Sequence, residues 1–294
     1  MAVYIFRKPI HYRKIVKVIS RKEYNKLLAS IDWPEYFIMQ DETWLPGTRY
    51  IDIQQERYFR VMGDICRIIS PDRNHKTVIA DFGCFPGGLG LLMRKYFGDA
   101  IELTGIGLAL RDDFRQAMSD NKIYDSLLEV DIDPENPLFA TNSFPAEIPL
   151  PVNSVDLIIA GEMFEHLYSP INFIAQTARI LKPGGKLLLT TPNISYFGNI
   201  CRLFCGKSIF PSLPESHIYL KSEWRAHMRV YDASEIKTLM AEGGFEEVRH
   251  YMIDNKDDAR RKQTFSGRLK MFFIRRSYII PYFRNQYIGI FKKV

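Results

Sequence analysis

The segment from Thr77 to Gly90, TVIADFGCFPGGLG, constrains the fold of this chain more than any other. An apolar run that ends in an acid and a glycine-rich turn is typical of a buried strand followed directly by a helix. Gly83, Gly87 and Gly88 permit a tight turn and allow a ligand to approach the backbone N–H groups at the helix start. The segment predicts a nucleotide-type ligand site, although a glycine-rich turn alone also fits a purely structural connection.

The chain after this segment alternates between apolar strand patterns and amphipathic helix patterns. One helix opens at Ser169-Pro170, and another begins with the Asp232/Glu235 capping box. Such alternation predicts a parallel, doubly wound sheet. The expected strands are Thr77–Ala80, Ile101–Gly107, Ser126–Ile132, Val155–Ala160, Lys186–Thr191, Phe245–Ile253 and Gln286–Lys292.

Four segments in this order resemble the class I S-adenosylmethionine-dependent methyltransferases, in particular the type 11-like domains that act on small molecules. They are ADFGCFPGG from Ala80, DIDPEN from Asp131, GEMFEHL from Gly161 and LKPGGKLLLTTPN from Leu181. The resemblance implies an α/β fold with a doubly wound, mostly parallel, seven-stranded sheet of Rossmann-like type that closes with an antiparallel hairpin.

The same resemblance implies S-adenosylmethionine as the cofactor. Asp81 and Gly83 are expected to support its methionine end, and Asp131 and Ile132 to hold the adenine. For Asp131 the alternative is a turn acid before Pro134. The full set of expected cofactor residues is Asp81, Gly83, Cys84, Gly87, Gly88, Gly107, Asp131, Ile132 and Glu162, the last of which is expected to face the sulfonium.

Two positions depart from the family pattern. Phe85 stands where a second glycine is usual, and Gly107 stands where an acid normally accepts the ribose hydroxyls. Charge-assisted hydrogen bonds are about twice as strong as neutral ones, so losing that acid would weaken cofactor binding. Asp112 or Asp113 could replace it.

Methyl transfer from a sulfonium requires mainly alignment and exclusion of water, so few catalytic side chains are expected. His166 is the candidate base, because an imidazole can accept a hydroxyl proton near neutral pH; the alternative is a structural role in the following turn. His227, Arg229 and Tyr231 resemble an H-x-R-x-[FY] string of small-molecule methyltransferases, and they are expected to face the substrate.

The chain divides into an N-terminal helical and aromatic extension, residues 1–70, and a methyltransferase domain, residues 71–294. Two segments are expected as insertions: 194–230 on the substrate side, and 255–284, which is basic and amphipathic. The second insertion could lie on a membrane interface, cover a lipid-like substrate or dock on the core.

Charge is distributed unevenly. Residues 1–26 have a net charge of +7 and residues 255–294 one of +9, which leaves −10 for the rest of a chain whose total is +6. An acidic body makes nucleic acid an improbable partner and suits a small-molecule, glycan or lipid-linked acceptor, with peripheral membrane contact through the basic termini. Ordinary solvated surface charge is the alternative.

The four cysteines show no disulfide or zinc-site spacing, so no metal is expected and a reducing, cytoplasmic location is favoured. The expected function is methyl transfer to a small-molecule, sugar or lipid-linked acceptor, most readily on oxygen. A non-catalytic interaction protein of the same fold and a nucleic-acid methyltransferase remain alternatives. A nicotinamide dehydrogenase is weaker, since the chain lacks G-x-G-x-x-G and the acid after the second strand.

Overall fold

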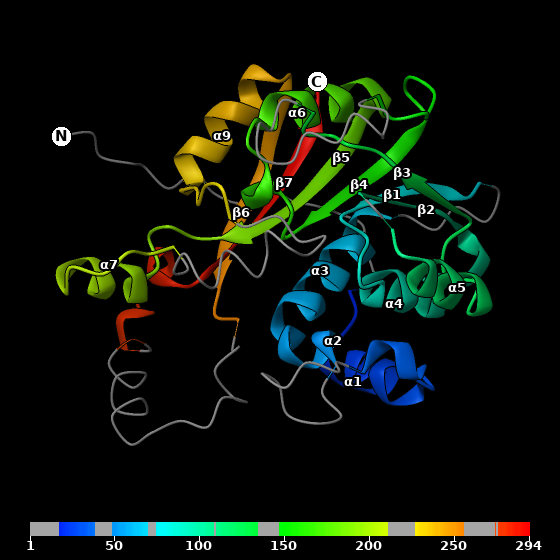
Figure 1. Ribbon diagram of the computed structural model, residues 1–294, viewed down its shortest axis with the longest axis horizontal. Helices are drawn as coiled ribbons and strands as arrows, with labels where there is room; N and C mark the ends of the chain where they lie inside the picture. Colours follow the sequence, from blue (N-terminus) through cyan, green and yellow to red (C-terminus); the bar gives the residue numbers. More distant parts are fainter. Residues whose placement is uncertain are drawn as a thin grey trace.

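A seven-stranded sheet in the order β3-β2-β1-β4-β5-β7-β6 forms the centre of the protein (Figure 1). The computed structural model describes residues 18–38, 49–69, 75–108, 110–134, 147–210, 227–255, 274 and 276–294. The strands are β1 (Thr77–Phe82), β2 (Ile101–Gly107), β3 (Ser126–Glu129), β4 (Val155–Gly161), β5 (Leu181–Pro192), β6 (Phe245–Ile253) and β7 (Gln286–Lys293).

The first five strands run parallel, and β7 is antiparallel to both β5 and β6. This is the doubly wound, mostly parallel sheet with a closing antiparallel hairpin that the sequence predicts. The central strands carry apolar runs that are buried on both faces: Ile79, Leu157 and Ile159 are fully buried on one face, and Ala80 and Ile158 on the other. Burial on both faces is typical of strands linked by crossover helices.

Helices cover both faces of the sheet. Figure 1 shows α3, α4 and α5 on one side of it and α6 and α9 on the other. The helices are α1 (Arg21–Ser30), α2 (Tyr50–Ile53), α3 (Gln55–Ile68), α4 (Gly88–Phe97), α5 (Asp112–Asp120), α6 (Pro170–Ile180), α7 (Phe197–Phe204) and α9 (Ala233–Glu242), with short 3₁₀ turns η1 (Glu35–Phe37), η2 (Gly98–Ala100), η3 (Phe164–His166) and η5 (Pro281–Phe283).

The described part of the N-terminal extension packs on the sheet. Tyr24, Ile51, Met62 and Ile65 are buried in the same apolar cluster as Ile79. The helical extension expected over residues 1–70 contains two consecutive helices here, because the backbone at Gln54 departs from helical geometry between α2 and α3. Arg57 and Tyr58, near the start of α3, line the same cavity as Asp81 at the end of β1.

The strand expected at Ser126–Ile132 is shorter than predicted. β3 ends at Glu129, and the backbone N–H of Asp133 donates to Oδ1 of Asp131 at 3.1 Å. This local turn ends the strand before Pro134 and brings Asp131 to the carboxyl edge of the sheet.

The two expected insertions are described in part. Residues 194–210 contain α7, and residues 227–230 lead into α9, whereas 211–226, 256–273 and 275 lie outside the described residues. Trp44 and residues 1–17 lie outside them as well. Within the described ranges, no helix is both long enough and apolar enough to cross a membrane.

Candidate functional site

The glycine-rich turn after β1 curls over the end of β2. The backbone N–H groups of Gly83 and Cys84 donate to the carbonyl of Ile106 at 2.9 and 3.3 Å, and the N–H of Gly87 donates to the carbonyl of Cys84 at 2.7 Å. Gly83 and Gly87 have φ of 67° and 85°, a region that favours glycine. A Cβ on Gly87 would lie 2.5 Å from Sδ of Met118, so the turn can follow this path only with glycine there.

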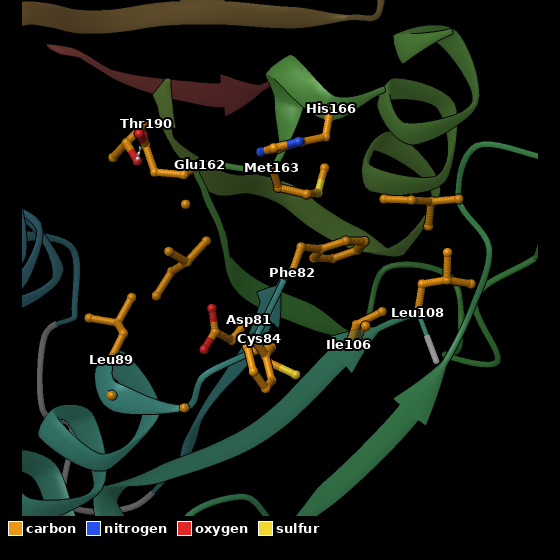
Figure 2. A pocket seen from close by; sticks show the side chains of 18 of the residues that line it. Asp81, Phe82, Cys84, Leu89, Ile106, Leu108, Glu162, Met163, His166 and Thr190 are labelled. Carbon is orange, nitrogen blue, oxygen red and sulfur yellow. Dashed lines mark hydrogen bonds between the residues drawn. The ribbon is translucent and has the colours of Figure 1, made fainter. Parts of the chain in front are cut away.

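A cavity opens above this turn at the carboxyl ends of β1, β2 and β4 (Figure 2). Every residue predicted to bind the cofactor lines it, and His166 lines it too. The remaining lining comes from the α2–α3 region, from the turn after β1 and the start of α4, from the ends of β1 to β5 and from the segment after β4. The predicted residues on the cavity are Asp81, Gly83, Cys84, Gly87, Gly88, Gly107, Asp131, Ile132, Glu162 and His166.

Asp81 lies at the floor of the cavity and is buried. Burial raises the pKa of its carboxyl to about 7, against the lowering effect of the hydrogen bond that the Tyr124 hydroxyl donates to Oδ2 at 2.7 Å. A carboxyl poised near neutrality gains from a cationic ligand group placed beside it. Asp81 is thus suited to hold an ammonium group.

The part of the cavity expected to hold the adenine is largely apolar: Leu108, Leu110, Val130 and Ile132 line it together with the buried Asp131. Asp131 accepts a hydrogen bond from the Asp133 backbone N–H, as an acid in a turn does, and it also lines the cavity. The two positions considered for Asp131 are therefore compatible.

Leu110 occupies the space beside Gly107 where the family's ribose acid would project. A Cβ on Gly107 would lie 2.6 Å from Cδ2 of Leu110. Asp113, one of the two proposed replacements, pairs with Arg111 at 2.6 Å, and neither Asp112 nor Asp113 is among the residues that line the cavity. The described residues around Gly107 therefore offer the ribose an apolar side chain.

Glu129 is Gly107's partner in the neighbouring strand. Its Oε1 accepts from the backbone N–H of Leu110 at 2.6 Å and its Oε2 pairs with Arg115 at 2.6 Å. This carboxylate thus holds the loop after β2 in place and is not directed to the cavity.

Glu162 projects from the turn after β4 with a φ of 53°, which is unusual for a residue with a side chain. Its Oε1 accepts from the Thr190 hydroxyl at 2.9 Å and from the Gln286 amide at 2.5 Å, and it lies 3.3 Å from Nη1 of Arg57. These contacts fix the carboxylate at the edge of the cavity and make up for the strained backbone.

Arg57 is a cavity residue that the sequence analysis missed. Its side chain is buried, and Nη2 donates to the Tyr50 hydroxyl at 3.2 Å. In the sequence Arg57 is one polar residue in an amphipathic helix pattern. Its position opposite Glu162 depends on the break at Gln54, which no pattern in the sequence indicates.

The candidate catalytic and substrate residues separate into two groups. His166 and His227 lie together, with ring centroids 4.7 Å apart, and each imidazole Nε2 faces Oε1 of Glu165, at 3.9 and 4.0 Å. Burial lowers the pKa of His227, although the Glu165 carboxylate opposes that effect. Glu165, His166 and His227 are placed so that they could hold a metal ion, a grouping absent from the sequence analysis.

Arg229 and Tyr231 are not among the cavity residues, so the structure does not place them where the sequence analysis expected. Tyr231 is buried with its ring 4.9 Å from that of Phe164, and Arg229 is exposed and forms an ion pair with Glu235. The H-x-R-x-[FY] string thus places its tyrosine in the core and its arginine at the start of α9.

The cavity suits S-adenosylmethionine chemically. The backbone at Gly87 and Gly88 leaves room at the start of α4, Asp81 suits the ammonium group, and the buried guanidinium of Arg57 suits the carboxylate. The apolar end around Ile132 suits a purine ring, and Met163 faces the loop from across the cavity (Figure 2).

Comparison with known proteins gives a family and several relatives. Residues 54–250 match a family model described as a methyltransferase domain. A probable S-adenosylmethionine-dependent methyltransferase of Mycobacterium tuberculosis is 31% identical over 35% of this chain and 31% of its own length. A ubiquinone biosynthesis O-methyltransferase of Burkholderia pseudomallei is 26% identical over 58% of this chain and 65% of its own length. In both cases the match spans less than two thirds of the relative.

Solved structures share the fold at low sequence identity. The [4+2]-cyclase SpnF superposes with a TM-score of 0.53 at 16% identity, covering 92% of this chain and 90% of that one. The phosphoethanolamine N-methyltransferase 2 of Haemonchus contortus gives a TM-score of 0.51 at 13% identity, covering 81% and 52%. With the family match and the sheet order, the chain belongs to the class I S-adenosylmethionine-dependent methyltransferases, and S-adenosylmethionine is its cofactor.

Proposed function

We propose that this methyltransferase transfers the methyl group to an oxygen of a small-molecule, sugar or lipid-linked acceptor. The observation that supports an oxygen acceptor most directly is the cluster beside the cavity, where His166 lines the cavity and Glu165 and His227 lie behind it. A hydroxyl must lose its proton as the methyl arrives, whereas a free amine can attack without prior deprotonation. The Burkholderia relative named as an O-methyltransferase supports the same choice.

In this proposal S-adenosylmethionine, when bound, supplies the methyl group on an already activated sulfonium. The residues of the chain then bind, orient and exclude water. Asp81 and Arg57 hold the two ends of the amino-acid portion, and Met163 and the turn after β4 shield the reacting centre. His166, which lines the cavity, accepts the proton of the acceptor hydroxyl in this proposal.

We also propose that the acceptor is met at a membrane surface, on the cytoplasmic side. Five exposed apolar side chains form what we call the apolar tip: Leu203, Phe204, Ile279, Ile280 and Tyr282. Phe204 is 88% exposed and Ile279 is 85% exposed. These side chains come from the end of α7 and from the residues before β7. The ring of Phe197, at the start of α7, lies 5.5 Å from that of Phe283, and α7 lies away from the sheet (Figure 1).

Basic side chains accompany the apolar tip. Arg202, Lys207 and Arg276 are exposed around it. Apolar side chains that can enter the interface, surrounded by cations that attract anionic headgroups, are typical of surfaces that bind peripherally to anionic bilayers. This arrangement supports a lipid-linked acceptor over a freely soluble one.

Incubation of the purified protein with methyl-labelled S-adenosylmethionine and a cell extract tests the acceptor class. We expect label in the organic-soluble fraction, in an ether or ester methyl group, and none with Gly83→Arg, which fills the cofactor turn. Label in protein, in nucleic acid or on a water-soluble amine would contradict the proposal.

Vesicle sedimentation tests the membrane surface separately. The wild type is expected to bind vesicles that contain phosphatidylglycerol more tightly than neutral ones, and Phe204→Asp with Ile279→Asp is expected to lose that binding. Ile171→Asp is the matched control, since Ile171 is 70% exposed on α6, outside the apolar tip. Equal binding by the tip and control variants would refute the assignment.

A further inference from the structure

We infer that Glu165, His166 and His227 form a binding site for a divalent transition-metal ion beside the cofactor cavity. One ligand atom from each of the three residues can be chosen so that all lie within 4.8 Å of one another. Two imidazoles and one carboxylate are a common ligand set for zinc, manganese and ferrous ions, and three protein ligands leave a position open for a further oxygen.

The carboxylate of Glu165 is the strongest indication of a ligand. The residue is 1% exposed, and among the described residues its Oε1 has no hydrogen-bond partner. Both imidazole Nε2 atoms approach this same oxygen, at 3.9 and 4.0 Å, which is too far for a hydrogen bond. A buried carboxylate oxygen without a partner is costly, and a metal ion between the three groups would remove that cost.

The distances fit a site that closes slightly on binding. Ligand atoms about 2.1 Å from a tetrahedral zinc ion lie about 3.4 Å from one another. Each nitrogen thus needs to move toward Oε1 by about half an ångström, which small side-chain rotations supply. The two rings are nearly perpendicular, at 78°, so they approach the oxygen from different directions.

The surrounding structure holds the ligands in place. The Thr191 hydroxyl donates to the other carboxylate oxygen, Oε2 of Glu165, at 2.9 Å. The backbone N–H groups of Met228 and Arg229 donate to the Glu165 carbonyl at 2.8 and 3.2 Å. These bonds join the turn after β4 to the segment that brings in His227, two parts of the chain that meet only in the fold. Oriented ligands of this kind are typical of built metal sites.

The site lies where a metal ion can act on the acceptor, because His166 also lines the cofactor cavity. With the ion bound, His166 serves as a ligand and no longer as the base. An acceptor hydroxyl bound to the ion has a lowered pKa, as zinc-bound water has, and releases its proton to water. The oxygen then forms a bond to the methyl carbon while the carbon–sulfur bond breaks, and the electron pair of that bond stays on sulfur as a neutral thioether. This role rests on the proposed oxygen acceptor, whereas binding of the ion does not.

Titration of tag-free, chelator-treated protein with ZnCl₂ tests the site, with Co²⁺ as a spectroscopic probe. We expect the wild type to bind one more equivalent of zinc than His227→Gln does. Any zinc that the variant still binds at this site should be held at least about tenfold more weakly than in the wild type. Co²⁺ is expected to show visible absorption that His227→Gln lacks. Glu165→Gln is a second variant that keeps the shape of the side chain.

His250→Gln is the matched control. His250 lies 3.0 Å from the Glu247 carboxylate and outside the cluster, so its loss is expected to leave zinc binding unchanged. Binding of S-adenosylmethionine by each variant, measured in parallel, separates this proposal from the proposed function, since the cofactor is expected to bind with or without zinc. Equal zinc binding by the wild type and His227→Gln, or none by the wild type, would overturn the metal site.

Discussion

Replacing Tyr124 by phenylalanine should shift the pH dependence of cofactor binding without changing the cavity wall. Tyr124 is not a lining residue; it acts through the 2.7 Å hydrogen bond that its hydroxyl donates to Oδ2 of Asp81. The buried carboxyl has a pKa of about 7, and the hydroxyl lowers it. Without the hydroxyl, the ionised Asp81 carboxylate loses a hydrogen bond that is worth about 1.5–3 kcal/mol. The pKa of Asp81 should therefore rise by about one to two units.

The size of the effect follows from the ionised fraction. If only ionised Asp81 holds the ammonium group of the cofactor, about half of the wild-type protein is competent at pH 7, and the competent fraction rises with pH until the carboxyl is fully ionised. For Tyr124→Phe the competent fraction at pH 7 falls to roughly 1–10%, so the Kd should be about five- to fiftyfold higher. The two proteins should converge at high pH.

Isothermal titration with S-adenosylmethionine from pH 6 to pH 9.5 measures this shift. Tyr251→Phe is the matched control, because the Tyr251 hydroxyl also donates to a buried aspartate, Oδ2 of Asp64, at 2.7 Å, away from the cavity. The control should follow the wild-type profile. A wild-type Kd that is independent of pH, or a Tyr124→Phe profile that coincides with the control, would refute the role of Asp81.

Three further substitutions test other parts of the site. The free energy of unfolding of Asp81→Asn should rise relative to that of the wild type as pH increases from 4 to 8, by up to about 4 kcal/mol. The raised pKa of the Asp81 carboxyl means that the wild type loses stability over that range. A stability difference between the two proteins that stays constant across this pH range would contradict this. Arg57→Leu should lower the free energy of unfolding, measured by urea denaturation, by about 3–5 kcal/mol and should weaken cofactor binding, since it leaves the Glu162 carboxylate without its buried cation. A loss below about 1 kcal/mol would count against the ion pair. Gly90→Val should destabilise the protein by about 1–3 kcal/mol and lower the thermal midpoint, because a Cβ there would lie 2.4 Å from the Tyr124 hydroxyl oxygen. Gly63→Ala is the control: the nearest contacts of a Cβ there are at 3.8 Å, so the thermal midpoint should not fall.

The strand pattern and the glycine turn were predictable from the sequence because both arise from local chemistry. Buried parallel strands require continuous apolar runs such as that in β4, and the turn after β1 requires glycine where φ is positive, at Gly83 and Gly87. Since parallel strands end at one edge of the sheet, the residues that follow them also gather there. The residues predicted to bind the cofactor therefore line one cavity.

Contacts between distant segments could not be predicted in the same way. Arg57 reaches the cavity because α2 and α3 break at Gln54, and His227 meets His166 because two backbone hydrogen bonds join segments about sixty residues apart. Tyr231 was expected at the substrate, but an aromatic side chain gains more from burial against Phe164. A motif places residues in order along the chain, whereas side-chain direction depends on packing.

Titration of the wild type and of Gly83→Arg with S-adenosylmethionine tests whether the cavity at the glycine-rich turn binds the cofactor. Thermal unfolding of both proteins is the check on folding. Gly83 has a φ of 67° and a Cβ there lies 3.2 Å from Cβ of Met163, so the arginine side chain must enter the cofactor cavity. We expect micromolar binding by the wild type and none by a folded Gly83→Arg protein. Absence of binding by the wild type, or the same Kd for both proteins, would contradict it.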